Sequence, residues 1–89
     1  MNLYLVSRSE PARDDQYDAL LVAANSSDQA RTIHPNDTIP VGEDWWNEDD
    51  TNKRRDWPQH PRDLKVEYVG IARPTIKEPQ VIIASFNAG

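Results

Sequence analysis

The hydrophobic residues of the chain gather in four short segments that have the spacing of β-strands. Residues 1–7 (MNLYLVS) and residues 17–24 (YDALLVAA) carry apolar side chains on both faces of an extended backbone, because odd and even positions are both apolar. Residues 9–16, which lie between them, contain Pro11 and two adjacent aspartates, and this composition favours a turn. We therefore predict that the first two strands form a hairpin with a connection longer than the minimum.

Two further strands are predicted near the end of the chain. Residues 64–72 (LKVEYVGIA) begin with an alternation of apolar and charged residues that is typical of a half-exposed strand, and Gly70 marks a candidate bulge in it. Residues 80–86 (QVIIASF) form the most apolar run of the chain. Pro74 and Pro79 lie between the two segments and predict a short turn that joins them as a second hairpin.

A single short helix is predicted after the second strand. Ser26 is a favourable N-cap, and Gln29 lies three residues later, as in a capping box. Ala30 and Ile33 share one face of this helix, and Pro35 is expected to end it at the preceding residue. A helix of this length is unstable alone, so we expect its apolar face to pack against the sheet.

These segments predict one α+β domain over residues 1–89. The expected order is β-β-α-long loop-β-β, with an antiparallel sheet of about four strands and the helix on one face of the sheet. A chain of 89 residues suits one modest core and is too short for two. The other face, to which we assign Tyr4 and Val6, then needs cover from the middle of the chain or from a second copy of the protein.

The middle of the chain, residues 36–63, does not have the pattern of this scaffold. It contains all three tryptophans but lacks the apolar period of a core strand or a long helix. Connections of this length in compact domains are usually binding loops or disordered segments, and three tryptophans argue against simple disorder. Eight acids and four bases give the segment a charge of −4, against −5 for the whole chain. We interpret it as a long acidic loop, the tryptophan loop, within the domain.

The parts of the chain on either side of the tryptophan loop resemble a known group of proteins. The opening NLYLVSR, the strand YDALLVAA followed by a short helix with QAR and IHP, and the ending VIIASFNAG are similar to short uncharacterised proteins of tailed phages and prophages. The EDWWNEDD run of the tryptophan loop is not part of this similarity. The resemblance implies a phage setting and an α+β scaffold, and it implies no particular chemistry.

The tryptophan loop supplies the candidate contacts with a partner protein. They are Glu43, Asp44, Trp45, Trp46, Glu48, Asp49 and Asp50. An exposed tryptophan offers contact area, and carboxylates around it steer a basic surface toward it. In an extended backbone Trp45 and Trp46 would point in opposite directions, so that one anchors the loop and the other faces solvent. The alternative is that all three tryptophans pack on the uncovered sheet face, and this is the favoured interpretation for Trp57.

Other chemistries have weaker signals in the sequence. The basic run 53–55 lies among acids and is best explained by internal ion pairs, so we expect no direct binding to nucleic acid. The acidic run lacks the spacing of a calcium-binding loop, and no metal site is predicted. His34 and His60 are the only histidines, cysteine is absent, and no serine lies in a nucleophile-elbow motif. We therefore predict neither catalytic residues nor a cofactor.

The function predicted from these features is that of a non-catalytic phage accessory protein that binds a host or phage protein with a basic surface. A sharper version is that it inhibits a defence enzyme or a nucleic-acid-processing enzyme by charge mimicry. The alternatives are a homo-oligomeric structural or packaging protein, such as a homodimer, and a small ligand-binding module or enzyme. The sequence shows no membrane-spanning run, signal-peptide pattern or cysteine, so we expect a cytoplasmic location, in the host cell if the protein is phage-encoded.

Overall fold

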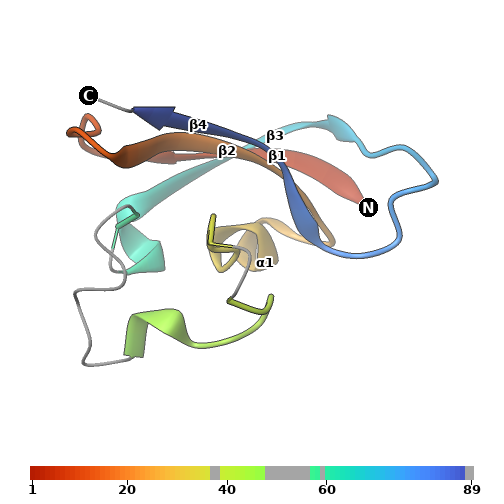
Figure 1. The fold of residues 1–89 in the computed structure, drawn as a ribbon. Helices are drawn as coiled ribbons and strands as arrows, with labels where there is room; N and C mark the ends of the chain where they lie inside the picture. Colours follow the sequence, from red (N-terminus) through yellow and green to blue (C-terminus); the bar gives the residue numbers. More distant parts are fainter. Residues whose placement is uncertain (37–38, 48–56, 59, 88–89) are drawn as a thin grey trace.

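The computed structural model describes residues 1–36, 39–47, 57–58 and 60–87, and it contains one antiparallel sheet and one short α-helix (Figure 1). This confirms the α+β class. In chain order the elements are β1 (Asn2–Arg8), β2 (Gln16–Ala24), α1 (Ser27–Arg31), the 3₁₀ helices η1 (Trp45–Asn47) and η3 (Pro61–Asp63), β3 (Leu64–Ile71) and β4 (Gln80–Asn87). Within the described residues, no helix combines the length and the apolar character needed to cross a membrane.

The four strands lie in the order β3-β1-β2-β4, and each neighbouring pair is antiparallel. The predicted first hairpin is confirmed, because β1 pairs with β2 in an unbroken register from Asn2 opposite Ala24 to Ser7 opposite Ala19. The predicted second hairpin is wrong, because β3 and β4 form the two opposite edges of the sheet.

The connection between β3 and β4, residues 72–79, crosses the end of the sheet instead of turning back (Figure 1). Hairpin loops usually have two to five residues, whereas a chain of about eight residues can span ~26 Å, more than the ~14 Å between the outer strands of a four-stranded sheet. The N–H of Ala72 donates to the carbonyl of Met1 over 3.0 Å, which holds the start of the connection beside β1. The strands with apolar residues on both faces, β1 and β2, thus take the central positions.

Both edge strands contain an irregularity. Gly70 of β3 lies opposite Leu3, but the next pair joins Tyr4 to Tyr68, so Val69 is an extra residue beside the predicted glycine. On β4, Ile82 is the extra residue between the partners of Leu21 and Val22. Each edge therefore departs locally from a regular ladder.

The start of α1 follows the predicted capping box in part, because Ser26 caps the helix but the Gln29 side chain bonds the N–H of Asn25 and not that of Ser26. The Ser26 hydroxyl accepts a hydrogen bond from the Gln29 N–H over 3.1 Å, and the Gln29 side-chain carbonyl accepts one from the Asn25 N–H over 2.7 Å. The helix ends at Arg31, three residues before the end that was predicted from Pro35. Ile33 therefore packs into the core from the segment that follows the helix.

We expect Ser26→Ala to lower the free energy of unfolding by about 1 kcal/mol, because the first turn of α1 loses the acceptor of one backbone N–H. The matched control is Ser27→Ala, which changes the next serine, exposed and inside the helix, and should be close to neutral. The measurement is the midpoint of urea unfolding. Equal shifts for the two variants would contradict the capping role of Ser26.

The elements between β2 and β3 all lie on one side of the sheet (Figure 1). The core on that side consists of Tyr4, Val6, Leu20, Val22, Ala24, Ala30, Ile33, Trp45, Trp57 and Leu64. The prediction that the helix and the Tyr4 face lie on opposite sides is therefore wrong. The physical reason is size: α1 has five residues and buries only Ala30, so the helix and the tryptophan loop together cover a single face.

The opposite face of the sheet, the open face, has no covering element among the described residues (Figure 1). Leu5 lies opposite Leu21 of β2, and Leu21 lies opposite Ile83 of β4, so an apolar row crosses three strands. Leu5 is 36% exposed and Ile83 is 63% exposed. The apolar residues on both faces of the strands predict that both faces need cover. Among the described residues, only the core face receives it.

Candidate partner-binding surface

The start of the predicted contact segment is held in a tight turn. The carbonyl of Pro40 accepts a hydrogen bond from the Glu43 N–H over 3.2 Å, and Gly42 between them has a φ of 93°, a conformation that glycine adopts without steric cost. The carbonyl of Glu43 then accepts from the Trp45 N–H over 2.9 Å, where η1 begins. This turn leaves Glu43 and Asp44 exposed, as predicted for contact residues.

Trp45 anchors the turn in the core. Its side chain is 1% exposed, and its indole N–H donates a hydrogen bond to the carbonyl of Thr32 over 2.7 Å. Thr32 is the C-cap of α1, so the bond satisfies a carbonyl at the helix end, where intrahelical donors are lacking. The Trp45 ring also packs edge-on against His34, with 5.1 Å between ring centroids. Trp45 is inaccessible to a partner, so its place among the predicted contact residues is wrong.

Trp46 is half-buried. Its ring lies 5.3 Å from the Trp45 ring at an angle of 89°, and 6.4 Å from the His60 ring. The expected extended backbone would have directed the two indoles apart, whereas the 3₁₀ helix brings them into contact. Trp46 is thus the one tryptophan of the chain that combines a packing role with a partly accessible surface.

Trp57 is a core residue, as the favoured interpretation predicted. It is 1% exposed and belongs to the same buried cluster as Trp45. Glu48, Asp49, Asp50 and the basic run 53–55 lie outside the described residues, so their predicted roles stay predictions.

Both histidines hold the local backbone through Nδ1. In buried His34 this atom accepts a hydrogen bond from the Asn36 N–H, and in half-buried His60 it accepts from the Arg62 N–H and caps η3, each over 3.0 Å. Within the part of the chain that the structure describes, no three His, Asp or Glu side chains are grouped as metal ligands would be.

Arg31 is a structural residue that the sequence analysis did not identify. Its Nη1 donates to the carbonyl of Leu64 over 2.6 Å and to that of Pro61 over 3.3 Å, which ties the last turn of α1 to the start of β3. A basic residue in the last turn is a recognisable signal of helix-end stabilisation. Its partners lie some thirty residues away and cannot be inferred from spacing.

One hollow in the described surface lies between residues 33–35, residues 39–41 and the start of β4. It has a volume of about 270 Å³ and is lined mostly by apolar residues: Ile33, His34, Pro35, Ile39, Pro40, Val41, Pro79, Gln80 and Val81. Small-molecule sites usually enclose about 300–1,000 Å³ and carry a few converging polar groups. This hollow lies just below that range, and a second hollow of about 320 Å³, lined by Arg8, Ser9, Glu10, Pro58 and Asp63, lies at its lower end. Volume therefore does not decide for or against the ligand-binding alternative.

Comparison of the chain with protein-family models finds no matching family, and comparison with curated proteins and with solved structures finds no match either. The function is therefore argued from the surface itself.

Proposed function

We propose that the protein is a non-catalytic binding protein whose acidic turn, Glu43 and Asp44, acts with the accessible part of Trp46 to contact a basic surface on a partner protein. The burial of Trp45 is the observation that carries this proposal. Because Trp45 is fixed in the core, the residues on either side of it are held at the surface in one arrangement. A preorganised contact loses less conformational entropy when it binds.

The charge of this surface supports a basic partner. Glu43 and Asp44 are exposed on a protein with a net charge of −5, and three more acids follow Trp46 and Asn47 in the sequence. Carboxylates at a contact rim accelerate association with a positive surface, while an aromatic ring contributes contact area.

The sharper version of the proposal concerns the kind of partner. An enzyme that binds nucleic acid presents a basic groove to phosphates, and an acidic protein surface can occupy such a groove in their place. A defence enzyme of a phage host is a partner of this kind. The phage setting depends only on the resemblance of the two chain ends and stays a prediction.

We expect the double variant Glu43→Gln/Asp44→Asn to recover less partner than the wild-type protein in a pull-down from bacterial lysate. The variant removes the steering charges and keeps the size of both side chains. Because salt screens exposed charges, the advantage of the wild type should shrink between about 50 and 300 mM salt. Trp46→Ala should also reduce recovery, at both salt concentrations, because it removes contact area. The partner is quantified by mass spectrometry.

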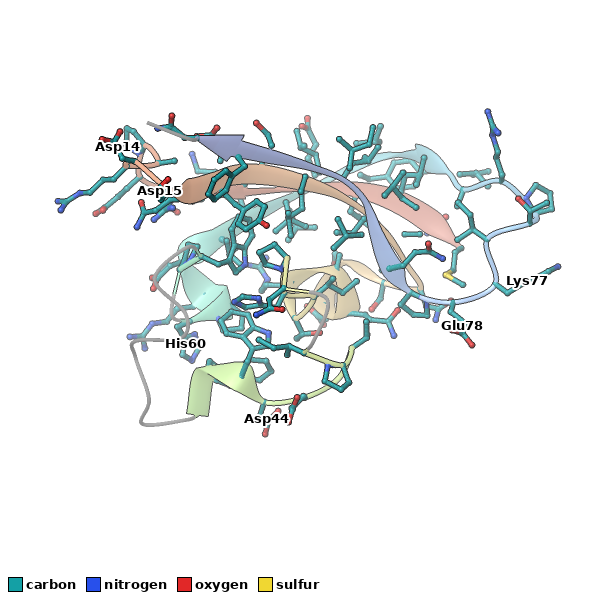
Figure 2. The ribbon with its side chains drawn as sticks, in the orientation of Figure 1. Asp14, Asp15, Asp44, His60, Lys77 and Glu78 are labelled. Atoms are coloured by element: carbon teal, nitrogen blue, oxygen red, sulfur yellow. The ribbon has the colours of Figure 1, made fainter. Side chains whose placement is uncertain are left out.

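The matched control is Asp14→Asn/Asp15→Asn, which removes the same number of charges elsewhere. Figure 2 shows Asp14 and Asp15 at one end of the sheet, whereas Asp44 lies in the layer below it. Asp15 has a φ of 60°, and asparagine tolerates this conformation well. If both double variants lose the partner to the same extent, only the net charge matters and the proposed contact turn is wrong.

A further inference from the structure

The edge strand β4 lacks most of the features that protect sheet edges. Its sequence, QVIIASFN, contains neither a charged residue nor proline, and its own extra residue is Ile82, near its start. A second irregularity in its pairing with β2 places the extra residue, Asp18, on β2. Residues 83–86 are all exposed, among them Ile83 at 63% and Phe86 at 47%. Successive side chains of a strand point to opposite faces. This part of β4 is therefore largely exposed on both faces of the sheet, and its one ring contact among the described residues is that of Phe86 with Tyr17 of β2, at 4.8 Å between ring centroids.

The other edge strand, β3, is better protected. It carries Lys65 and Glu67, and it has its own extra residue, Val69. The guanidinium of Arg31 also donates to the carbonyl of Leu64, at the start of the strand. Charges and side-chain caps of this kind discourage the addition of a further strand. β3 also exposes apolar side chains, Tyr68, Val69 and Ile71, so the difference between the two edges is that β4 has no charge and, among the described residues, no such side-chain cap at its start.

We infer that β4 pairs with β4 of a second copy of this chain, antiparallel and about a twofold axis, so that the two sheets become one. In such a contact both copies contribute the same strand. Each residue of one copy contacts the same residue of the other copy or a residue next to it. Two copies that each carry a charge of −5 repel one another. An uncharged strand is the part of the sheet at which they can approach most closely.

The charges at the two ends of the sheet fit an antiparallel arrangement. The β1–β2 turn contains three acids and one base, and its Asp15 N–H donates to the carbonyl of Asn87 at the end of β4. The connection before β4 contains two bases, Arg73 and Lys77, and one acid, Glu78. Figure 2 shows Asp14 and Asp15 at one end of the sheet and Lys77 at the other. Antiparallel pairing brings the acidic end of each copy toward the basic end of the other, which favours a second copy as the occupant.

The contact is small. A single strand edge with Ile83 and Phe86 buries less than the roughly 1,600 Å² of a standard stable interface, so we expect a dissociation constant on the order of tens of micromolar. The Glu43–Asp44 turn lies outside this contact. The inference therefore does not depend on the proposed function.

The test is sedimentation velocity of the full chain over about 1–500 µM, a range chosen to bracket an interface of this size. The wild-type protein is expected to shift from a 10.2 kDa monomer to a dimer as the concentration rises. Ile83→Lys should weaken the dimer at least tenfold, because it places two lysines close together across the twofold axis. An equimolar mixture of Ile83→Lys and Ile83→Glu should restore a dimer. A wild-type protein that stays monomeric at the highest concentration overturns the inference.

Two control variants separate this contact from other ways of pairing. Leu5→Lys changes the middle of the open face, and Glu67→Lys changes the other edge, and both should dimerise as the wild type does. If Leu5→Lys abolishes the dimer while Ile83→Lys retains it, the two copies pack face to face and the inference is wrong. Tryptophan fluorescence reports folding in every variant, because Trp45 and Trp57 are buried on the opposite face of the sheet.

Discussion

Replacing Trp45 with alanine is expected to lower the free energy of unfolding by about 3–5 kcal/mol, the cost typical of removing a buried large aromatic side chain. The variant would leave a cavity beside His34 and remove the donor that bonds the Thr32 carbonyl. Domains of this size are stable by about 5–15 kcal/mol, so the variant should lose a large share of its stability. Urea unfolding followed by far-UV circular dichroism measures this loss without depending on the removed chromophore.

Trp46→Ala is the matched control, because it removes the same kind of side chain from the next position. Trp46 is half-buried, so its loss should cost clearly less than that of Trp45. Trp45→Phe keeps an aromatic ring in the core but removes the indole N–H. The loss of the bond to the Thr32 carbonyl should lower the free energy of unfolding by about 1–3 kcal/mol. If the two alanine variants unfold alike, Trp45 does not anchor the turn, and the proposed function loses its structural basis.

The positions of the strands could be predicted from the sequence because alternation is a local property. Each predicted strand boundary lies within one residue of the observed one. The N-cap of α1 was equally predictable, since Ser26 and Gln29 act on backbone groups a few residues away. The order of the strands was not predictable in this way. A connection of eight residues with two prolines is compatible with a hairpin or with a crossing, and the choice depends on how the central strands pair.

The covered face of the sheet could not be predicted either. Tyr4 with Val6 and Leu3 with Leu5 are both apolar pairs, and nothing in the alternation distinguishes them. The difference arises from the tryptophan loop, which brings Trp45 and Trp57 onto the face that α1 already occupies. Apolar residues on both faces of a strand indicate that both faces of the sheet favour burial. They do not indicate which segment of the chain covers each face.

The candidate surface was predicted in part, for the same reason. The exposure of Glu43 and Asp44 follows from their charge and from the turn around Gly42. Trp45 and Trp46 are identical neighbours, so no propensity separates the core residue from the half-buried one. The two residues differ in their contacts: the Thr32 carbonyl and the His34 ring lie against Trp45, and these contacts form only when the chain folds.

The two faces of the sheet should respond very differently to the loss of one leucine. Leu20→Ala is expected to cost about 2–5 kcal/mol, because the side chain is fully buried on the core face. Leu5→Ala should cost only about 1 kcal/mol, because removing a side chain that is 36% exposed on the open face leaves no enclosed cavity.

Leu5→Ala and Leu20→Ala are a matched pair of variants, because Leu5 and Leu20 lie in adjacent strands at the centre of the sheet. Urea unfolding at about 1 µM protein keeps any dimer dissociated, so that association adds nothing to the measured stability. Repeating the measurement at a concentration where the dimer forms should raise the stability of wild type and Leu5→Ala equally, because the β4 contact does not involve Leu5. A gap between them that widens with concentration would mean that a second copy covers the open face, and pairing through β4 would then be the wrong geometry.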